Sequence, residues 1–202
     1  MTRQKIKDSF TAFLRPLIWF LVRRRLHPDV LTMFGVILSL VAAYTFSTGY
    51  VRISGLLVLL AGLFDVLDGQ VARAARKGNK FGALLDSTAD RYSEIFVAFG
   101  IAVYLIRNAW WTTSAILFFA LAGSLMVSYV RARAEGLGEE CTVGFMQRPE
   151  RILSIGLGSL IGGTALIFVL WSVALLTNYT VVQRLRYIWK KSRKQVGLNV
   201  PK

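Results

Sequence analysis

Long apolar stretches constrain the fold of this chain more than any other feature of its sequence. Five stand out, at residues 31–47, 53–72, 82–106, 110–130 and 152–182. A helix crosses the hydrocarbon core of a bilayer in about 20 residues, so each of the first four suits one span. The fifth is too long for one span, and a turn at Gly162 and Gly163 would divide it. We therefore predict an all-α, polytopic membrane protein with six transmembrane helices, the last two over residues 149–161 and 164–190.

Composition agrees with a membrane protein and argues against nucleic-acid binding. Apolar residues make up 54% of the chain, and Lys and Arg outnumber Asp and Glu by 25 to 11. A basic excess is typical of nucleic-acid binding or of a membrane surface, but here the basic residues lie outside the apolar stretches. Cys141 is the single cysteine, so no disulfide can form within the chain. His27 has no second His or Cys pair that would complete a metal site.

The positions of the basic residues predict the orientation. Of the Lys and Arg residues, only Arg52 and Arg107 fall on one side of the six predicted spans, and all the others fall on the opposite side. Loops rich in Lys and Arg stay in the cytoplasm. We therefore expect both termini and the longer links to face the cytoplasm, with the protein in the cell membrane.

Residues 1–28 predict a different kind of helix. Apolar residues there repeat at helical spacing among basic ones: Phe10, Phe13, Leu14, Leu17, Ile18 and Leu21. This pattern is typical of an amphipathic helix in the membrane interface, and its apolar run is too short for a seventh span. We expect Pro16 to bend it. One domain, 1–202, would thus comprise this interfacial helix, a six-helix bundle at 29–190 and a basic cytoplasmic tail at 191–202.

Four aspartates lie near the cytoplasmic ends of the second and third predicted spans, where ionisable residues are costly and usually functional. Asp65 and Asp68 are three residues apart, and Asp86 and Asp90 are four apart, so each pair shares one face of its helix. The link between the two helices is short, which lets them run antiparallel with the carboxylates facing each other. Taken singly, an aspartate at a span end can also be a surface charge that pairs with an arginine.

Four converging carboxylates require positive charge, and their oxygens suit hard cations such as Mg²⁺, Mn²⁺ or Ca²⁺. Small residues on the same faces would let a ligand come close: Gly69, Ala72 and Gly82. Basic residues surround this point: Arg73, Arg76, Lys77 and Lys80. A divalent metal beside guanidinium groups at a membrane surface predicts a site for phosphate or pyrophosphate.

Together these residues resemble the signature of the CDP-alcohol phosphotransferase family. The matching pattern is Asp65-x2-Asp68-Gly69-x2-Ala72-Arg73-x8-Gly82-x3-Asp86-x3-Asp90. The resemblance implies Mg²⁺ or Mn²⁺, as two ions, bound by Asp65, Asp68, Asp86 and Asp90, and a CDP-linked lipid held through its pyrophosphate.

By the same resemblance, Asp90 is the general base that takes the proton from the acceptor hydroxyl, whose oxygen attacks the lipid-side phosphorus while CMP leaves. The CDP-lipid would also contact Gly69, Ala72, Arg73, Gly82 and Thr32. Thr32 ends a Pro-Asp-x-Leu-Thr sequence that resembles the family's Pro-Asn-x-Leu-Thr, although a helix N-cap region explains it equally well.

A second group of residues indicates a phosphorylated acceptor. Ser128 and Arg131 end the fourth predicted span, and Arg148 and Arg151 begin the fifth, where helix N-terminal amides also favour anions. This stretch resembles the inositol-phosphate branch of the family, whose members make phosphatidylinositol phosphate or its archaetidyl equivalent. The resemblance implies CDP-diacylglycerol or CDP-archaeol as donor and inositol phosphate as acceptor. Glycerol 3-phosphate would need a similar pocket, and cytoplasmic arginines can also serve only as topology determinants.

Other classes of protein remain open from the sequence alone. Intramembrane carboxylates also serve ion-coupled transporters, although transport sites tend towards the bilayer midplane. A regulatory protein that binds anionic lipid would explain the basic rim but not the aspartate spacing. The resemblance further implies a homodimer, and glycines on the spans would allow the close packing, within or between chains, that this needs: Gly123, Gly156 and Gly158.

Overall fold

The computed structural model describes residues 3–75 and 80–198, and the regular secondary structure of this part of the chain is all helix, without strands. Its helices are α1 (Arg3–Arg23), α2 (Pro28–Ser47), α3 (Val51–Ala74), α4 (Lys80–Arg107), α5 (Trp111–Gly136), α6 (Arg148–Ile161) and α7 (Gly163–Leu198). The all-α prediction is confirmed, and each predicted span corresponds to one helix.

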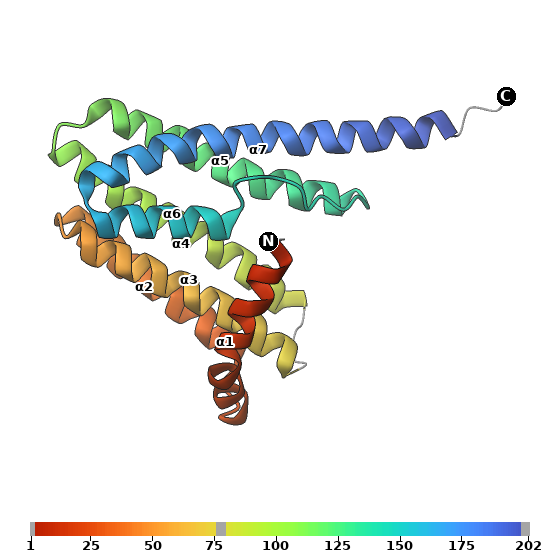
Figure 1. Cartoon of the computed structure of the whole chain (residues 1–202), viewed down its shortest axis with the longest axis horizontal. Coiled ribbons are helices and arrows are strands. Elements are labelled where there is room, and N and C mark those ends of the chain that lie inside the picture. The colour runs from red at the N-terminus through yellow and green to blue at the C-terminus, as the bar shows by residue number, and fades with distance from the viewer. Residues whose placement is uncertain (1–2, 76–79, 199–202) are drawn as a thin grey trace.

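Helices α2 to α7 form a bundle in which α2 packs against α3 and α4, α3 packs against α6, and α5 packs against α7. Figure 1 shows the tight connections α2–α3, α4–α5 and α6–α7 at one end of the bundle, and the ends of α3, α5 and α7 directed towards the other. The predicted turn within the last apolar stretch is confirmed. It lies at Gly162, whose φ of +147° is one that side-chain-bearing residues rarely adopt.

Three of the described helices are long and apolar enough to cross a membrane: Pro28–Ser47, Trp111–Gly136 and Gly163–Arg193. Helices α3 and α4 carry the charged residues of the site, which interrupts their apolar stretches. Helix α6 has 14 residues, which span about 21 Å against a hydrocarbon core of about 30 Å. The membrane character of the chain is therefore supported, whereas the count of six spans stays a prediction.

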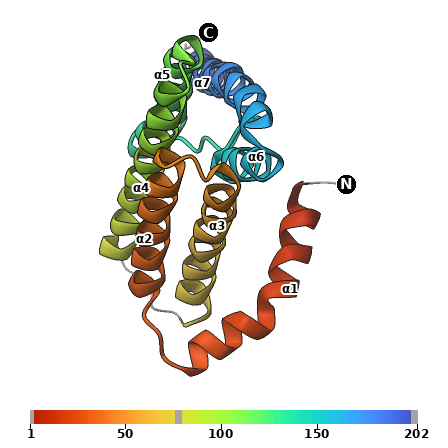
Figure 2. The same ribbon diagram turned by 90° about the vertical axis from the view of Figure 1, so that its left-hand side faces the viewer.

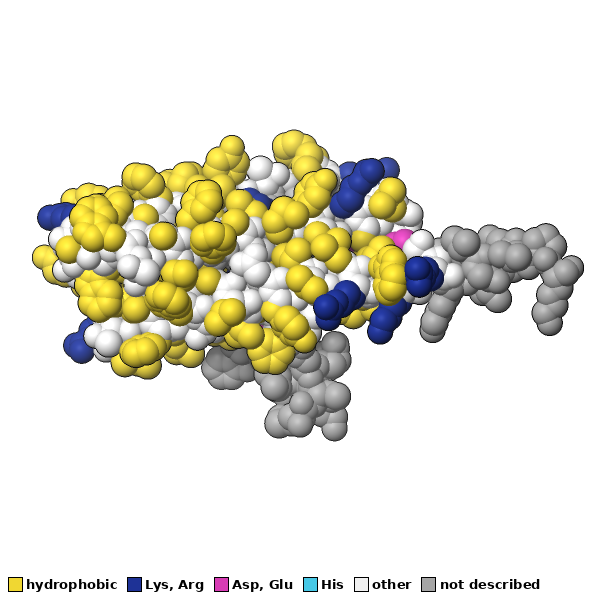
Figure 3. Space-filling model, turned by 90° about the horizontal axis from the view of Figure 1, so that it is seen from above, with side chains coloured by type: hydrophobic (Ala, Val, Ile, Leu, Met, Phe, Trp, Pro, Cys, Tyr) yellow, Lys and Arg dark blue, Asp and Glu magenta, His cyan; other side chains and the backbone are white. Residues whose placement is uncertain are grey.

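The outer surface agrees with this membrane character. Large apolar side chains are exposed along several helices, among them Phe34 on α2, Phe99 on α4, Phe118 on α5 and Phe168 on α7. Figure 3 shows one face covered largely by hydrophobic side chains, with most of the Lys and Arg side chains towards its ends. In a water-soluble protein such a surface would be a liability, but it suits contact with lipid tails.

Helix α1 bends partway along its length (Figure 2), and it contains Pro16, which lacks the amide hydrogen that a helix interior requires. Its inner face packs on α3, since Leu14 and Ile18 are buried together with Leu67 and Val71. Leu17, on another side, is exposed. The side chains of Phe10 and Phe13 lie outside the described residues. A bent helix with one buried face is thus confirmed, and its place in the membrane interface stays a prediction.

Glycines bring the helices into backbone contact at several points. A Cβ at Gly100 on α4 would lie 2.3 Å from the carbonyl oxygen of Ala43 on α2, and one at Gly55 on α3 would lie 2.7 Å from that of Gly156 on α6. These distances leave no room for a side chain. The second contact fixes α6 against α3, which brings the start of α6 beside the aspartates.

The predicted packing glycines face neighbours within the same chain. A Cβ at Gly123 would lie 2.4 Å from Thr177 Oγ1, and one at Gly158 would lie 2.7 Å from Val169 Cγ2. They therefore serve the fold of one chain and do not argue for a dimer. Helix α7 continues beyond the expected end at residue 190 to Leu198, so the basic tail begins as a helical extension of the bundle (Figure 1).

Candidate active site

The two aspartate pairs meet as the helical spacing predicted. Asp65 and Asp68 lie on α3, and Asp86 lies on α4. One carboxylate oxygen from each of the three lies within 4.8 Å of one from each of the others. Asp68 is only 4% exposed, so this cluster is at the inner edge of the site rather than on its surface. Three carboxylates so close together repel one another strongly unless a cation shares them.

Two contacts of the cluster bear on what it can bind. The hydroxyl of Thr32 on α2 donates a hydrogen bond to Asp68 Oδ2 at 2.7 Å, which orients that carboxylate from the neighbouring helix. Asp86 Oδ1 is buried and has no hydrogen-bond partner among the described residues. A buried carboxylate oxygen without a partner is costly, and a bound cation would satisfy it. Oxygen donors from three carboxylates are also the chemistry that Mg²⁺ and Mn²⁺ prefer, so the residues present fit a divalent metal.

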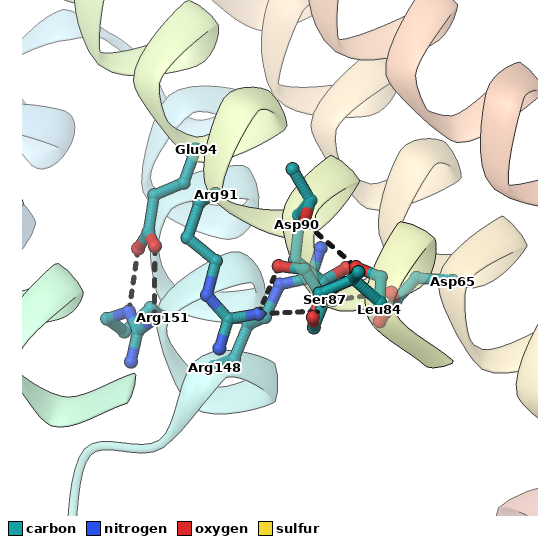
Figure 4. Close-up of polar contacts among 9 residues, drawn as sticks. Asp65, Leu84, Ser87, Asp90, Arg91, Glu94, Arg148 and Arg151 are labelled. Carbon is teal, nitrogen blue, oxygen red and sulfur yellow. Dashed lines mark hydrogen bonds and ion pairs between the residues drawn. The ribbon is translucent and has the colours of Figure 1, made fainter. Parts of the chain in front are cut away.

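Arg148 joins the fourth aspartate to the cluster. Its Nη1 forms an ion pair with Asp90 Oδ1 at 2.6 Å and another with Asp65 Oδ1 (Figure 4). Asp90 is also 3.4 Å from Arg91 Nη1. Arg148 is the first residue of α6, whose start is fixed by a capping box between Gln147 and Glu150. The local sequence thus places the guanidinium of Arg148 at the start of α6, and packing against α3 holds that helix in position.

Arg151 lies one turn along α6 and is almost entirely buried, with 1% exposure. Its Nε and Nη2 donate to the two carboxylate oxygens of Glu94 on α4, at 2.8 and 3.2 Å (Figure 4). Its Nη1 is buried without a partner among the described residues. Glu94 was not predicted as a site residue. The signal was present, because Glu94 continues the spacing of four residues that relates Asp86 to Asp90.

These groups share one pocket. Its lining includes the charged residues Asp65, Asp68, Asp90, Glu94, Arg148 and Arg151. It continues into the bundle between apolar side chains such as Ile101, Leu117 and Leu170. Three of the predicted metal ligands, Asp65, Asp68 and Asp90, and two of the predicted acceptor residues therefore line one otherwise apolar cavity. Asp86 does not line it, but its carboxylate lies within 4.8 Å of those of Asp65 and Asp68.

The other predicted donor-site residues lie at or near the ends of α3 and α4. A Cβ at Gly69 would lie 3.4 Å from Arg73 Nη2, so the guanidinium of the exposed Arg73 lies over that glycine. Ala72 and Gly82 are partly buried on α3 and α4. Arg76 and Lys77 lie outside the described residues, and Lys80 is exposed at the first position of α4.

Two predicted acceptor residues are not brought to the pocket. Ser128 and Arg131 lie near the end of α5 and do not line it. Arg131 is half exposed and pairs with Glu135 at 2.8 Å. A further arginine, Arg184 on α7, was not predicted and is buried, with hydrogen bonds to the carbonyl oxygens of Val127 and Val143. It ties α5, the 137–147 loop and α7 together. The one feature of the sequence that could have drawn attention to Arg184 is its position directly after a long apolar stretch.

Comparison with known proteins identifies the class that this fold and site define. The family description CDP-alcohol phosphatidyltransferase matches residues 25–181. The chain belongs to this family of membrane transferases, as the aspartate signature indicated.

The relatives narrow the resemblance further. The chain is 35% identical over 190 residues to the phosphatidylinositol phosphate synthase of Mycobacteroides abscessus, covering 90% of this chain and 86% of the relative. It is 37% identical over 198 residues to the archaetidylinositol phosphate synthase of Methanothermobacter thermautotrophicus, covering 92% and 97%.

Solved structures agree. The phosphatidylinositol phosphate synthase of Mycobacterium tuberculosis with CDP-DAG bound superposes with a TM-score of 0.76 at 33% identity, over 86% of this chain and 92% of that one. The same enzyme in complex with manganese and citrate gives 0.76 at 34% identity, over 86% and 88%.

Replacing one carboxylate of the cluster tests its fit for a metal. We expect Asp86→Asn to lower the affinity for Mn²⁺ by about tenfold or more, because a neutral amide replaces a charged ligand of a hard cation. Electron paramagnetic resonance of free Mn²⁺, in detergent-solubilised protein, measures this affinity. Asp29→Asn is the matched control, since Asp29 pairs with His27 at the start of α2, outside the cluster. Equal Mn²⁺ affinities of Asp86→Asn and wild type would contradict the metal site.

Proposed function

We propose that this protein transfers a phosphatidyl or archaetidyl group from a CDP-linked lipid to inositol phosphate and releases CMP, in phospholipid biosynthesis. The observation that carries the proposal is one pocket lined by Asp65, Asp68 and Asp90 together with Arg148 and Arg151. Asp86 lies beside this pocket and completes the cluster of three converging carboxylates with Asp65 and Asp68. Carboxylates that share a metal suit the pyrophosphate of a CDP-lipid, and guanidinium groups suit the phosphate of the acceptor. The names of the relatives, which are phosphatidylinositol and archaetidylinositol phosphate synthases, support this choice of acceptor.

The donor would lie at the end of the bundle where α3 and α4 begin their link. Asp65, Asp68 and Asp86 would hold the metal, and we propose Mg²⁺ or Mn²⁺, as two ions with Asp90 completing the ligands. Bound there, a divalent cation would supply positive charge to the pyrophosphate oxygens and so favour departure of CMP. The small Gly69, Ala72 and Gly82 would leave room for the nucleotide, and Arg73 would pair with its phosphates. Thr32 would act indirectly, because it orients Asp68.

The acceptor would enter from the side of α6. Arg151 would bind its phosphate, with Arg148 beside it. Asp90 would then accept the proton of the attacking hydroxyl. The new bond joins that oxygen to the lipid-side phosphorus, and the bond from phosphorus to the CMP oxygen breaks. Holding both reactants in one pocket is the main contribution that such a protein can make to this reaction.

The membrane arrangement follows the same proposal. We propose that α2 to α7 form six spans, with α1 in the interface, and that the site and both termini face the cytoplasm of the cell membrane, as a homodimer. The positions of the basic residues support this orientation. Water-soluble inositol phosphate would then reach the pocket from the cytoplasm, while the lipid donor stays in the bilayer.

Glycerol 3-phosphate is the alternative acceptor, which would make the protein a phosphatidylglycerophosphate synthase. An ion-coupled transporter is the alternative from another class, because buried carboxylates also bind coupling ions. The location of the aspartates at one end of the bundle, beside arginines, favours phosphate chemistry. Solute flux in sealed vesicles without CMP release would favour the transporter.

Release of CMP by purified protein is the test of the proposed function. With CDP-diacylglycerol and Mg²⁺, we expect turnover with inositol 1-phosphate and none with free inositol or serine, because only a phosphorylated acceptor needs the arginines. CDP-archaeol is the parallel donor. Turnover with glycerol 3-phosphate alone would correct the acceptor and keep the reaction. Absence of CMP release with every combination of donor and acceptor would contradict the proposal.

Removing the carboxylate of Asp90 separates catalysis from donor binding. We expect Asp90→Asn to reduce kcat by at least about a hundredfold, since an amide cannot take the proton from the hydroxyl. Binding of the CDP-lipid should change little, because Asp65, Asp68 and Asp86 remain. Equilibrium binding of CDP-diacylglycerol and CMP release are measured on the same preparation. Loss of donor binding with an unchanged kcat would contradict the role of Asp90 as the base.

A further inference from the structure

Glu94 and Arg151 form the most completely buried ion pair of the described site, and nothing in the aspartate signature requires it. The side chain of Arg151 is 2% exposed and that of Glu94 is 19% exposed. Both oxygens of Glu94 accept a hydrogen bond from Arg151. A bidentate pair of this kind fixes the plane of the guanidinium as well as its position.

The pair leaves one group of Arg151 free to bind something else. Nε and Nη2 face Glu94, and Nη1 is buried without a partner among the described residues. Arg151 lines the same pocket as Asp90 and Arg148. A buried guanidinium nitrogen without an acceptor is costly, and a phosphate oxygen in that pocket would satisfy it.

The position of Glu94 on α4 gives the pair a second property. Asp90 and Glu94 are four residues apart on one helix, so they lie on the same face and about one turn, or ~5 Å, from each other. Through Glu94, the guanidinium of Arg151 is attached to the same helix that carries Asp90, the proposed base. Asp90 itself pairs with the other arginine, Arg148, at 2.6 Å.

We infer that Glu94 is a positioning residue: it holds Arg151 so that Nη1 meets the acceptor's phosphate in the pocket that Asp90 also lines. The inference rests on the proposed function, since it assumes a phosphorylated acceptor. Glu94 thereby fixes where the acceptor's phosphate is held relative to Asp90. A rigid inositol ring and a flexible glycerol chain respond differently to a fixed phosphate position, so Glu94 contributes to the choice between inositol phosphate and glycerol 3-phosphate.

The sign of the effect distinguishes positioning from simple charge. A carboxylate near a phosphate repels it, so removal of a carboxylate that acted only through its charge would lower the acceptor KM. Removal of a carboxylate that holds Arg151 in place would raise it. A purely structural role would instead lower stability and change the donor and acceptor parameters together.

The experiment compares Glu94→Gln and Glu94→Asp with wild type in CMP release. We expect Glu94→Gln to raise the KM for inositol 1-phosphate by about tenfold or more, with the KM for CDP-diacylglycerol and kcat within about twofold. The preference over glycerol 3-phosphate should fall. Glu94→Asp keeps the charge and one shortened contact, so its effect should be smaller, about threefold. Glu140→Gln makes the same chemical change at an exposed residue of the 137–147 loop and should leave all parameters unchanged.

An unchanged or lower acceptor KM in Glu94→Gln would overturn the inference, as would equal changes in both substrates' KM. If Glu94→Gln does not fold, as shown by thermal unfolding in detergent, Glu94→Asp carries the same comparison, and an unchanged acceptor KM there overturns it.

A separate measurement tests the role of Glu94 if the proposed function fails. If wild type releases no CMP with any acceptor, binding of inorganic phosphate in the presence of Mg²⁺, measured by calorimetry, decides the inference. Binding that is about tenfold weaker in Glu94→Gln than in wild type supports it. Equal or tighter binding in the variant, or no binding by wild type, overturns it.

Discussion

The mutual repulsion of the aspartates is the constraint on which the rest of the site depends. Two like charges separated by about 5 Å repel by about 3 kcal/mol at an effective dielectric constant of about 20. Asp65, Asp68 and Asp86 present oxygens within 4.8 Å of one another, so their convergence must be compensated by cations and fixed donors. The structure supplies Thr32 as a donor to Asp68 and Arg148 as a counter-charge to Asp65 and Asp90. The unpartnered oxygen of Asp86 leaves the cluster with capacity for a metal.

Helix packing is what keeps these charges together. The approach of Gly55 to Gly156 brings α6 against α3, and the capping box at Gln147 begins α6 at the level of the aspartates. Hydrogen bonds from Arg184 fix the 137–147 loop that leads to this point. The acidic helices α3 and α4 thus meet the basic start of α6 at one end of the bundle. An apolar exterior and a charged inner pocket suit an enzyme that takes one substrate from the lipid and one from water.

Local periodicity explains what could be predicted from the sequence, and contacts between distant parts of the chain explain what could not. The convergence of Asp65, Asp68 and Asp86 followed from the spacing of residues on two helices joined by a short link, and the turn at Gly162 followed from a glycine pair in an apolar stretch. By contrast, the pairing of Arg148 with Asp65, and of Arg151 with Glu94, depends on how α6 packs against α3 and α4. No periodicity in the sequence reports such packing. Arg131 was wrongly expected in the pocket for the same reason. The path of α5 places it outside the pocket, where it pairs with Glu135 on its own helix.

A manganese anomalous difference map, from crystals grown with Mn²⁺, tests the central claim most directly. The claim is that the carboxylates of Asp65, Asp68 and Asp86 form the divalent-cation site around which both substrates are arranged. The account predicts an anomalous peak bounded by these three carboxylates, with Asp86 Oδ1 among its ligands. Manganese bound elsewhere in the protein, with no peak between the three aspartates, would contradict it.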